Sequence, residues 1–231
     1  IRLGQGNKAA AFRILGNIVL LNVIFGVATM AACLLFLDKL LFLFGASEAT
    51  IGFAHEYMSI LLWGNVITHL YLGLNAILRS TGYPTKSMVV MLISVGVDCV
   101  LEPLFIFGFD WGIAGSAYAT VIAQTTALIY ELVHFANPKH FLHFRRSIFR
   151  LRKDITLKII SIGMAPFLVQ SCASLVSMLN NNALREYGGD LHIGAFSIVN
   201  RIAMLFIMIV NGLNQGMQPI VGYNYGAKLY D

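Results

Sequence analysis

The segment Met88–Gly108 reads MVVMLISVGVDCVLEPLFIFG and sets the architecture expected of the whole chain. It is long enough to cross a bilayer as one α-helix, because about 20 apolar residues span the hydrocarbon core. Its only charged residues are Asp98 and Glu102. Their spacing of four residues places both carboxylates on the same helical face. Acids inside a membrane span are costly and usually face a cavity, so this segment indicates a functional site within the membrane.

The rest of the chain has the same apolar character. Of its 231 residues, 58% are hydrophobic and 12% are charged, and its mean hydropathy is +0.74. A soluble domain carries about twice that charged fraction. The apolar residues form long blocks, whereas the strands of a membrane barrel alternate over segments of about 10 residues. The expected fold class is therefore an all-α polytopic membrane protein.

Six blocks are long enough to cross the membrane as helices. They cover residues 14–37, 51–78, 87–108, 112–135, 157–184 and 193–217. Glycine, proline and small polar residues lie between the blocks and predict turns. These turns are expected at Phe44–Ser47, Thr81–Pro84, Phe109–Gly112 and Tyr187–Asp190. Pro103, inside the third block, is expected to kink its helix because it cannot donate a backbone hydrogen bond.

The basic residues predict the orientation of these spans. Thirteen of the 16 lysines and arginines fall on one side, and only Lys39, Arg185 and Arg201 fall on the other. The positive-inside rule places the first side, and both ends of the sequence, in the cytoplasm. The most basic loop there, residues 136–156, is interpreted as a linker near anionic lipid rather than as a nucleic-acid surface. The expected location is the cytoplasmic (inner) membrane.

Two similar short segments lie near the ends of the sequence. Residues 3–9 read LGQGNKA and residues 224–228 read NYGAK, and six predicted spans separate them. A repeat of six spans is typical of a duplicated transporter. We therefore expect the chain to be a fragment, about the middle half of a two-lobe protein with 12 spans.

Several segments, in this order, resemble the multidrug and toxic compound extrusion (MATE) transporter family. They are LGQGNKAAAF, LFGASEATIGFAHEYMSILL, LNAILRSTGYPTKSM, DCVLEPLFIFGFDWGIAGSAYATVIAQ, ISIGMAPFLVQ and GLNQGMQPIVGYNYGAKLYD. The resemblance covers essentially the whole chain. It implies that residues 1–135 hold helices three to six of the amino-terminal lobe. Residues 136–156 would then be the linker, and residues 157–231 would begin the carboxy-terminal lobe with helices seven and eight.

The resemblance also implies a cation-coupling cluster in the amino-terminal lobe. The matching residues are Tyr57, Asn75, Asp98, Glu102 and Thr120. The family commonly has Asn and then Asp where this chain has Asp98 and then Glu102, so the cluster here is more acidic. We associate sodium-coupled members with an acid on the seventh helix, but the matching position here is the neutral Gln170.

The chemistry of the two acids also follows from elementary electrostatics. Two carboxylates one turn apart repel each other when both are ionised, so the pair is suited to bind a proton or share one monovalent cation. Sodium would bind Asp98 and Glu102 only transiently, and we expect no resident metal. No cofactor is expected, and a proton or sodium gradient would supply the energy. The alternative is that both acids only form hydrogen bonds between packed helices.

The expected function is a secondary antiporter that exports drugs or toxic organic compounds by alternating access, without enzymatic activity. Its expected partners are small drug-like molecules and the lipid bilayer, with no nucleic acid, and the protein is expected to be a monomer. One alternative is a flippase for lipid-linked saccharides of the same broad superfamily. Another is a membrane-embedded enzyme or scaffold. The sequence leaves open the substrate, the choice between proton and sodium, the residues on missing helices and the oligomeric state.

Overall fold

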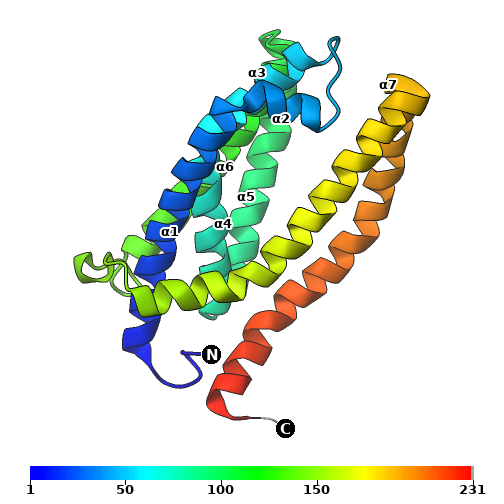
Figure 1. The fold of residues 1–231 in the computed structure, drawn as a ribbon. Helices are drawn as coiled ribbons and strands as arrows, with labels where there is room; N and C mark the ends of the chain where they lie inside the picture. The colour runs from blue at the N-terminus through cyan, green and yellow to red at the C-terminus, as the bar shows by residue number, and fades with distance from the viewer. Residues whose placement is uncertain (230–231) are drawn as a thin grey trace.

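The computed structural model describes residues 1–229, apart from the side chains of residues 146, 185, 189, 190 and 193. Its helices, in chain order, are α1 (Lys8–Leu35), α2 (Leu37–Leu43), α3 (Ile51–Trp63), α4 (Asn65–Ser80), α5 (Pro84–Pro103), η1 (Leu104–Gly108), α6 (Gly112–Ala136), η2 (Arg146–Ile148) and α7 (Lys153–Ala227). Helices α1 to α6 form a bundle, and α7 runs beside it as two long arms, drawn in yellow and in orange to red (Figure 1).

The helices confirm a multi-pass membrane protein. Five segments are long and apolar enough to cross a membrane: Lys8–Leu35, Pro84–Gly108, Gly112–Ala136, Lys153–Gly188 and Gly194–Ala227. Helices α3 and α4 form a sixth span if they are counted as one, and the chain bends by 56° between them. The bend lies at Gly64, where a Cβ atom would stand only 2.7 Å from a methyl group of Val121 on α6. The absence of a side chain at Gly64 therefore lets α6 approach the bend.

The expected junction at Tyr187–Asp190 does lie between two spans, Lys153–Gly188 and Gly194–Ala227, but the backbone stays helical there instead of forming a non-helical turn. The chain nevertheless reverses direction within α7 (Figure 1). Asn182 donates a hydrogen bond to the carbonyl oxygen of Leu43 at one end of the bundle (2.8 Å). Gln215 accepts one from Arg79 at the other end (2.6 Å). Glycines at 188 and 189 weaken the helix at this point but do not end it.

Pro103 changes the type of helix that contains the two acids. Helix α5 ends at Pro103, and the next five residues, Leu104–Gly108, form a π-helix. Proline has no backbone N–H, so the regular pattern of α-helical hydrogen bonds cannot continue through it. Short π-helical turns inside membrane helices often lie next to functional sites. Here the π-helical turn begins two residues after Glu102.

Helix α6 lies at the centre of the bundle and packs against α3, α4, α5 and η1. Its buried face is rich in small residues: Ala114, Gly115, Ala117, Ala119, Ala123 and Ala127. Small residues let neighbouring membrane helices approach closely. The close packing brings the polar side chains of α5 and α6 within hydrogen-bonding distance.

The segment between α6 and α7 is held against α1 by the fully buried Asn17. Its side-chain nitrogen donates to the carbonyl oxygens of Arg13 (2.8 Å) and Arg150 (3.3 Å). Its side-chain oxygen accepts hydrogen bonds from the backbone N–H of Arg152 (3.0 Å) and the hydroxyl of Thr156 (3.3 Å). A single amide therefore fixes the point where the basic loop ends and α7 begins.

The two similar short segments near the ends of the sequence meet in space. A Cβ atom on Gly4 would stand 2.9 Å from the backbone nitrogen of Ala227, and one on Gly226 would stand 2.9 Å from the backbone of Ile1. Only glycine permits so close a contact between two backbones at these positions. The N-terminal segment is thereby packed against the last turns of α7.

Candidate functional site

Asp98 and Glu102 lie one turn apart on α5, and both side chains are partly exposed. Glu102 Oε1 accepts a hydrogen bond from Ser116 Oγ on α6 (2.6 Å). Thr120, one turn further along α6, lies within hydrogen-bonding reach of Asp98. Its hydroxyl also donates to the backbone oxygen of Ser116 (3.1 Å). Two carboxylates and two hydroxyls therefore face one another across the α5–α6 contact.

This group of four side chains is chemically suited to hold one positive charge. Asp98 Oδ1 is buried and has no hydrogen-bond partner among the described atoms. A buried carboxylate oxygen without a partner is unfavourable, so binding a proton or a cation there is favourable. Carboxylate and hydroxyl oxygens are also ligands that hard cations accept. Among residues 1–229, no three His, Cys, Asp or Glu side chains cluster as a resident metal would require.

Asn75 lies elsewhere. Its side-chain nitrogen donates to the carbonyl oxygen of Ser87 (3.1 Å), and its side-chain oxygen accepts from the Ser87 hydroxyl (2.7 Å). Ser87 precedes Asp98 by 11 residues on α5, which corresponds to roughly 16 Å along the helix. The structure therefore places Asn75 far from the two acids, and its role in cation coupling stays a prediction.

Tyr57 is the fifth predicted site residue. It lies on α3, is half-buried, and belongs to a helix that packs against α6. No hydrogen bond joins Tyr57 to Asp98 or Glu102 in the described part of the chain. The structure thus brings together three of the five predicted residues, Asp98, Glu102 and Thr120.

Helix α6 carries a polar stripe that sequence reasoning did not identify. The stripe consists of Ser116, Thr120, Gln124 and Glu131, whose spacing of four, four and seven residues keeps them on one helical face. Between the ends of the stripe, Gln124 accepts a hydrogen bond from Thr68 on α4 (2.5 Å). The spacing of these polar residues in an otherwise apolar helix was the signal that could have revealed the stripe.

Glu131 is the most deeply buried acid of the described chain, with a side chain that is 0% exposed. Its polar neighbours are Asn75 and Tyr71 on α4. Glu131 is also an acid within a predicted span, residues 112–135. The argument that predicted a functional role for Asp98 and Glu102 therefore applies equally to Glu131.

A group of basic and aromatic residues lies beyond Glu131 at the end of α6. The rings of His134 and His140 stack with centroids 3.8 Å apart and planes at 16°. Lys86 Nζ lies 3.3 Å from His134 Nδ1, and the ring of Tyr83 contacts both histidines edge-on. Partial burial and the nearby Lys86 ammonium lower the pKa of His140, which belongs to the loop after α6.

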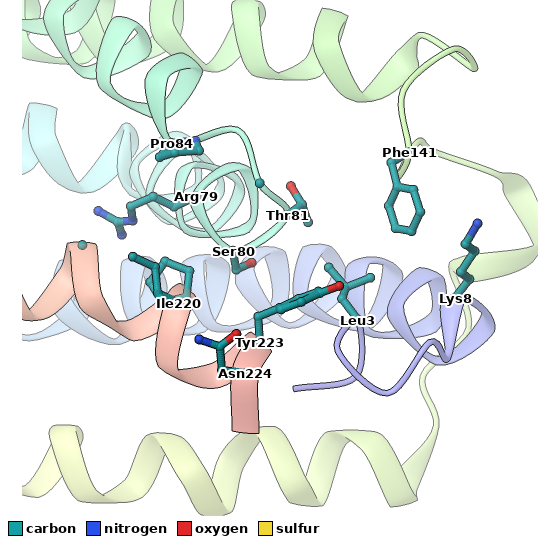
Figure 2. A pocket seen from close by; sticks show the side chains of 13 residues that line it. Leu3, Lys8, Arg79, Ser80, Thr81, Pro84, Phe141, Ile220, Tyr223 and Asn224 are labelled. Carbon is teal, nitrogen blue, oxygen red and sulfur yellow. The ribbon is translucent and has the colours of Figure 1, made fainter. Parts of the chain in front are cut away.

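A cavity of about 710 Å³ is separate from the acids. It lies between the N-terminal segment, the turn from α4 to α5, the loop after α6 and the last turns of α7 (Figure 2). Most of its lining is apolar, from residues such as Leu3, Phe141 and Ile220, and Lys8 and Arg79 provide two positive charges. None of the predicted coupling residues lines this cavity.

Comparisons with known proteins agree on one family. The MatE family model matches residues 2–104 and 166–231. The multidrug export protein MepA of Staphylococcus aureus (strain NCTC 8325 / PS 47) is 27% identical over 219 residues, which are 95% of this chain and 47% of MepA.

Solved structures of transporters show the same fold. An outward-facing multidrug resistance MATE family transporter of the MOP superfamily aligns with a TM-score of 0.88 and 26% identity, over 99% of this chain and 51% of that one. An inward-facing conformation of such a transporter aligns with a TM-score of 0.80 and 26% identity, over 97% and 49%. The chain spans about half the length of the relatives it matches. Because the family model covers more than half of its residues, the chain belongs to the MatE family of membrane transporters.

Proposed function

We propose that this chain forms part of a cation-coupled exporter of drug-like organic compounds, and that Asp98 and Glu102 bind the coupling ion. The proposal is supported chiefly by the arrangement of these two acids with Ser116 and Thr120 between packed helices. MepA, which is 27% identical over 219 residues, is a multidrug export protein. The proposed location is the cytoplasmic membrane, with both ends of the described chain on the cytoplasmic side.

The proposed mechanism is alternating access, in which the ion and the substrate favour different conformations. A ligand shifts a conformational equilibrium only through its different affinity for the two states. A proton or sodium ion bound by Asp98 and Glu102 would stabilise the conformation in which these acids lie closest to the hydroxyls of Ser116 and Thr120 on α6. Substrate would then be released as the ion binds, and the ion gradient would drive the cycle.

The first test uses the full-length protein in proteoliposomes loaded with ethidium, a fluorescent organic cation. Proton and sodium gradients are imposed separately, and the rate of dye transport is recorded. The double variant Asp98→Asn, Glu102→Gln keeps side-chain size but removes both charges. We expect its gradient-driven transport to fall to the level of protein-free liposomes.

The control is Glu48→Gln, a substitution of the exposed acid in the loop before α3. It should transport like the unmodified protein. Undiminished gradient-driven transport by the Asp98, Glu102 double variant would refute the coupling role. Movement of a lipid-linked saccharide without dye transport would instead support the flippase alternative.

A further inference from the structure

Glu131 is a buried acid that the proposed coupling pair does not account for. Neither of its carboxyl oxygens is exposed, and neither has a hydrogen-bond partner among the described atoms. An acid inside a membrane span is rarely kept without a role, because a buried polar group without a partner destabilises the fold.

The side chains around Glu131 are polar and uncharged. The Asn75 amide is fixed by two hydrogen bonds to Ser87 and lies close to the Glu131 carboxyl group, whose two oxygens have no hydrogen-bond partner among the described atoms. On the same side of α4, the phenol of Tyr71 lies within reach of the Ser94 hydroxyl. Tyr71 is the titratable group of α4 that lies near enough to Glu131 to interact with it electrostatically.

No cation pairs with the Glu131 carboxyl group in the described part of the chain. The ammonium of Lys86, one residue before Ser87 on α5, bonds instead to the ring of His134. On α6 itself, His134 follows Glu131 by three residues and uses its Nδ1 atom in that contact. An ionised Glu131 would therefore be a buried, unpaired charge, which is strongly unfavourable.

A sodium ion does not fit these surroundings well. Sodium requires several free oxygen ligands, but the Asn75 oxygen and the Ser87 hydroxyl are hydrogen-bonded to each other. The remaining groups are an amide N–H and a phenol, which suit a carboxylic acid better than a metal ion.

We propose that Glu131, with Asn75 and Tyr71, forms a second proton-binding site at the cytoplasmic end of the bundle, which exchanges its proton with the cytoplasm during transport. The proposal rests on the proposed function, since it assigns Glu131 to the same ion-coupled cycle. The polar stripe of α6 extends from Ser116, which bonds to Glu102, to Glu131, and the Gln124–Thr68 hydrogen bond lies between them. On the other side, His134 and the stacked His140 lead to the cytoplasmic loop.

Infrared spectroscopy of the purified full-length protein tests the proton directly. At neutral pH, the carbonyl stretching band of a protonated carboxylic acid should be present and should disappear in Glu131→Gln. The band should remain in the double variant Asp98→Asn, Glu102→Gln and in the control Glu48→Gln. An unchanged band in Glu131→Gln would overturn the proposal.

If Glu131→Gln does not fold, Asn75→Ala should shift the frequency of this band, and an unshifted band would equally overturn the proposal.

Transport measurements then test the exchange of that proton. In proteoliposomes, Glu131→Gln should slow proton-driven ethidium transport by roughly 10²-fold, because one step of proton transfer is lost. Ethidium binding at equilibrium should stay within about twofold of the unmodified protein, since Glu131 does not contact substrate in this scheme. Normal proton-driven transport by Glu131→Gln would overturn the exchange role. If the unmodified protein itself shows no gradient dependence, the proposed function fails, whereas the infrared result still decides whether Glu131 holds a proton.

Discussion

The bundle of α1 to α6 and the two arms of α7 are both apolar, but only the bundle buries its own surface. In the most apolar stretch of α6, 39% of the residues are buried, whereas none is buried in the corresponding stretches of either α7 arm. The bundle therefore has a core of its own, which holds the acids of α5 and α6 in place. The apolar faces of α7 are left for lipid or for other helices.

The two regions also differ in where their polar side chains form hydrogen bonds. In the bundle, polar side chains point inward and bond to neighbouring helices, as Ser116 bonds to Glu102. In α7, neutral amides reach across to the bundle at its two ends, as Asn182 does to Leu43 and Gln215 to Arg79. The bundle thus keeps its polar groups between packed helices, whereas α7 contacts the bundle through hydrogen bonds near its two ends.

The largest expected difference between the two regions concerns stability. Phe135 in the bundle is 1% exposed and Phe206 in α7 is 69% exposed. Phe135→Ala should lower the free energy of unfolding by roughly 3–5 kcal/mol, because it leaves a cavity in a packed core. Phe206→Ala should lower it by less, because this ring is exposed within the described chain and its removal leaves no cavity in the core of the bundle. Denaturant unfolding of the full-length protein in detergent measures both, and equal losses would show that α7 is as firmly packed as the bundle.

The contact between the two regions should have a smaller energy. Arg79→Ala or Gln215→Ala removes a hydrogen bond to a charged group, which contributes about 1 kcal/mol and shifts a conformational equilibrium about fivefold. Spin labels at Thr81 and Lys228 would report a larger population in which this end of α7 lies apart from the bundle. The control is Gln218→Ala, since Gln218 makes no side-chain hydrogen bond in the described structure. An unchanged distance distribution in Gln215→Ala would show that this contact does not hold the ends together.

The smallest expected effect concerns His140 in the loop that follows the bundle. Its pKa is lowered from the ordinary value of 6.5 by partial burial and by Lys86. As the pH falls below 6.5, the unfolded chain binds a proton at this position before the folded chain does, so stability is lost. His140→Phe keeps an aromatic ring against His134 and removes this titration.

The melting temperature of the His140→Phe variant should therefore decrease less than that of the unmodified protein as the pH falls from about 7 to about 5. The difference should correspond to about 0.5 kcal/mol or less, because the side chain is only partly buried. Parallel pH profiles for the two proteins would show that the loop histidine does not contribute to acid sensitivity.

Hydropathy alone was sufficient to predict the spans, because long apolar blocks rarely form anything other than membrane helices. Hydropathy predicted less well the residues at which the helices begin and end. Helix α1 begins at Lys8 rather than at residue 14, since the side chain of Asn7 accepts a hydrogen bond from the N–H of Ala10 (3.0 Å) and caps the helix. The bend at Gly64 could not be predicted either, because it depends on contact with Val121 of a distant helix.

For the candidate site as well, local spacing could be predicted but contacts between distant helices could not. Local spacing predicted that Asp98 and Glu102 share a helical face, which requires only helix periodicity. The pairing of Glu102 with Ser116, and of Asn75 with Ser87 instead of the acids, depends on how α4, α5 and α6 are aligned along their axes. No local pattern in a single sequence encodes that alignment.

The contact of Gly4 and Gly226 with the opposite end of the sequence also has a consequence for biosynthesis. A ribosome adds about 5–20 residues per second, so roughly 10–45 seconds pass between the synthesis of these two glycines. During that time the bundle can insert and pack before the N-terminal segment meets the last turns of α7. The contact between the N-terminal segment and the last turns of α7 can therefore form only after α7 has been synthesised.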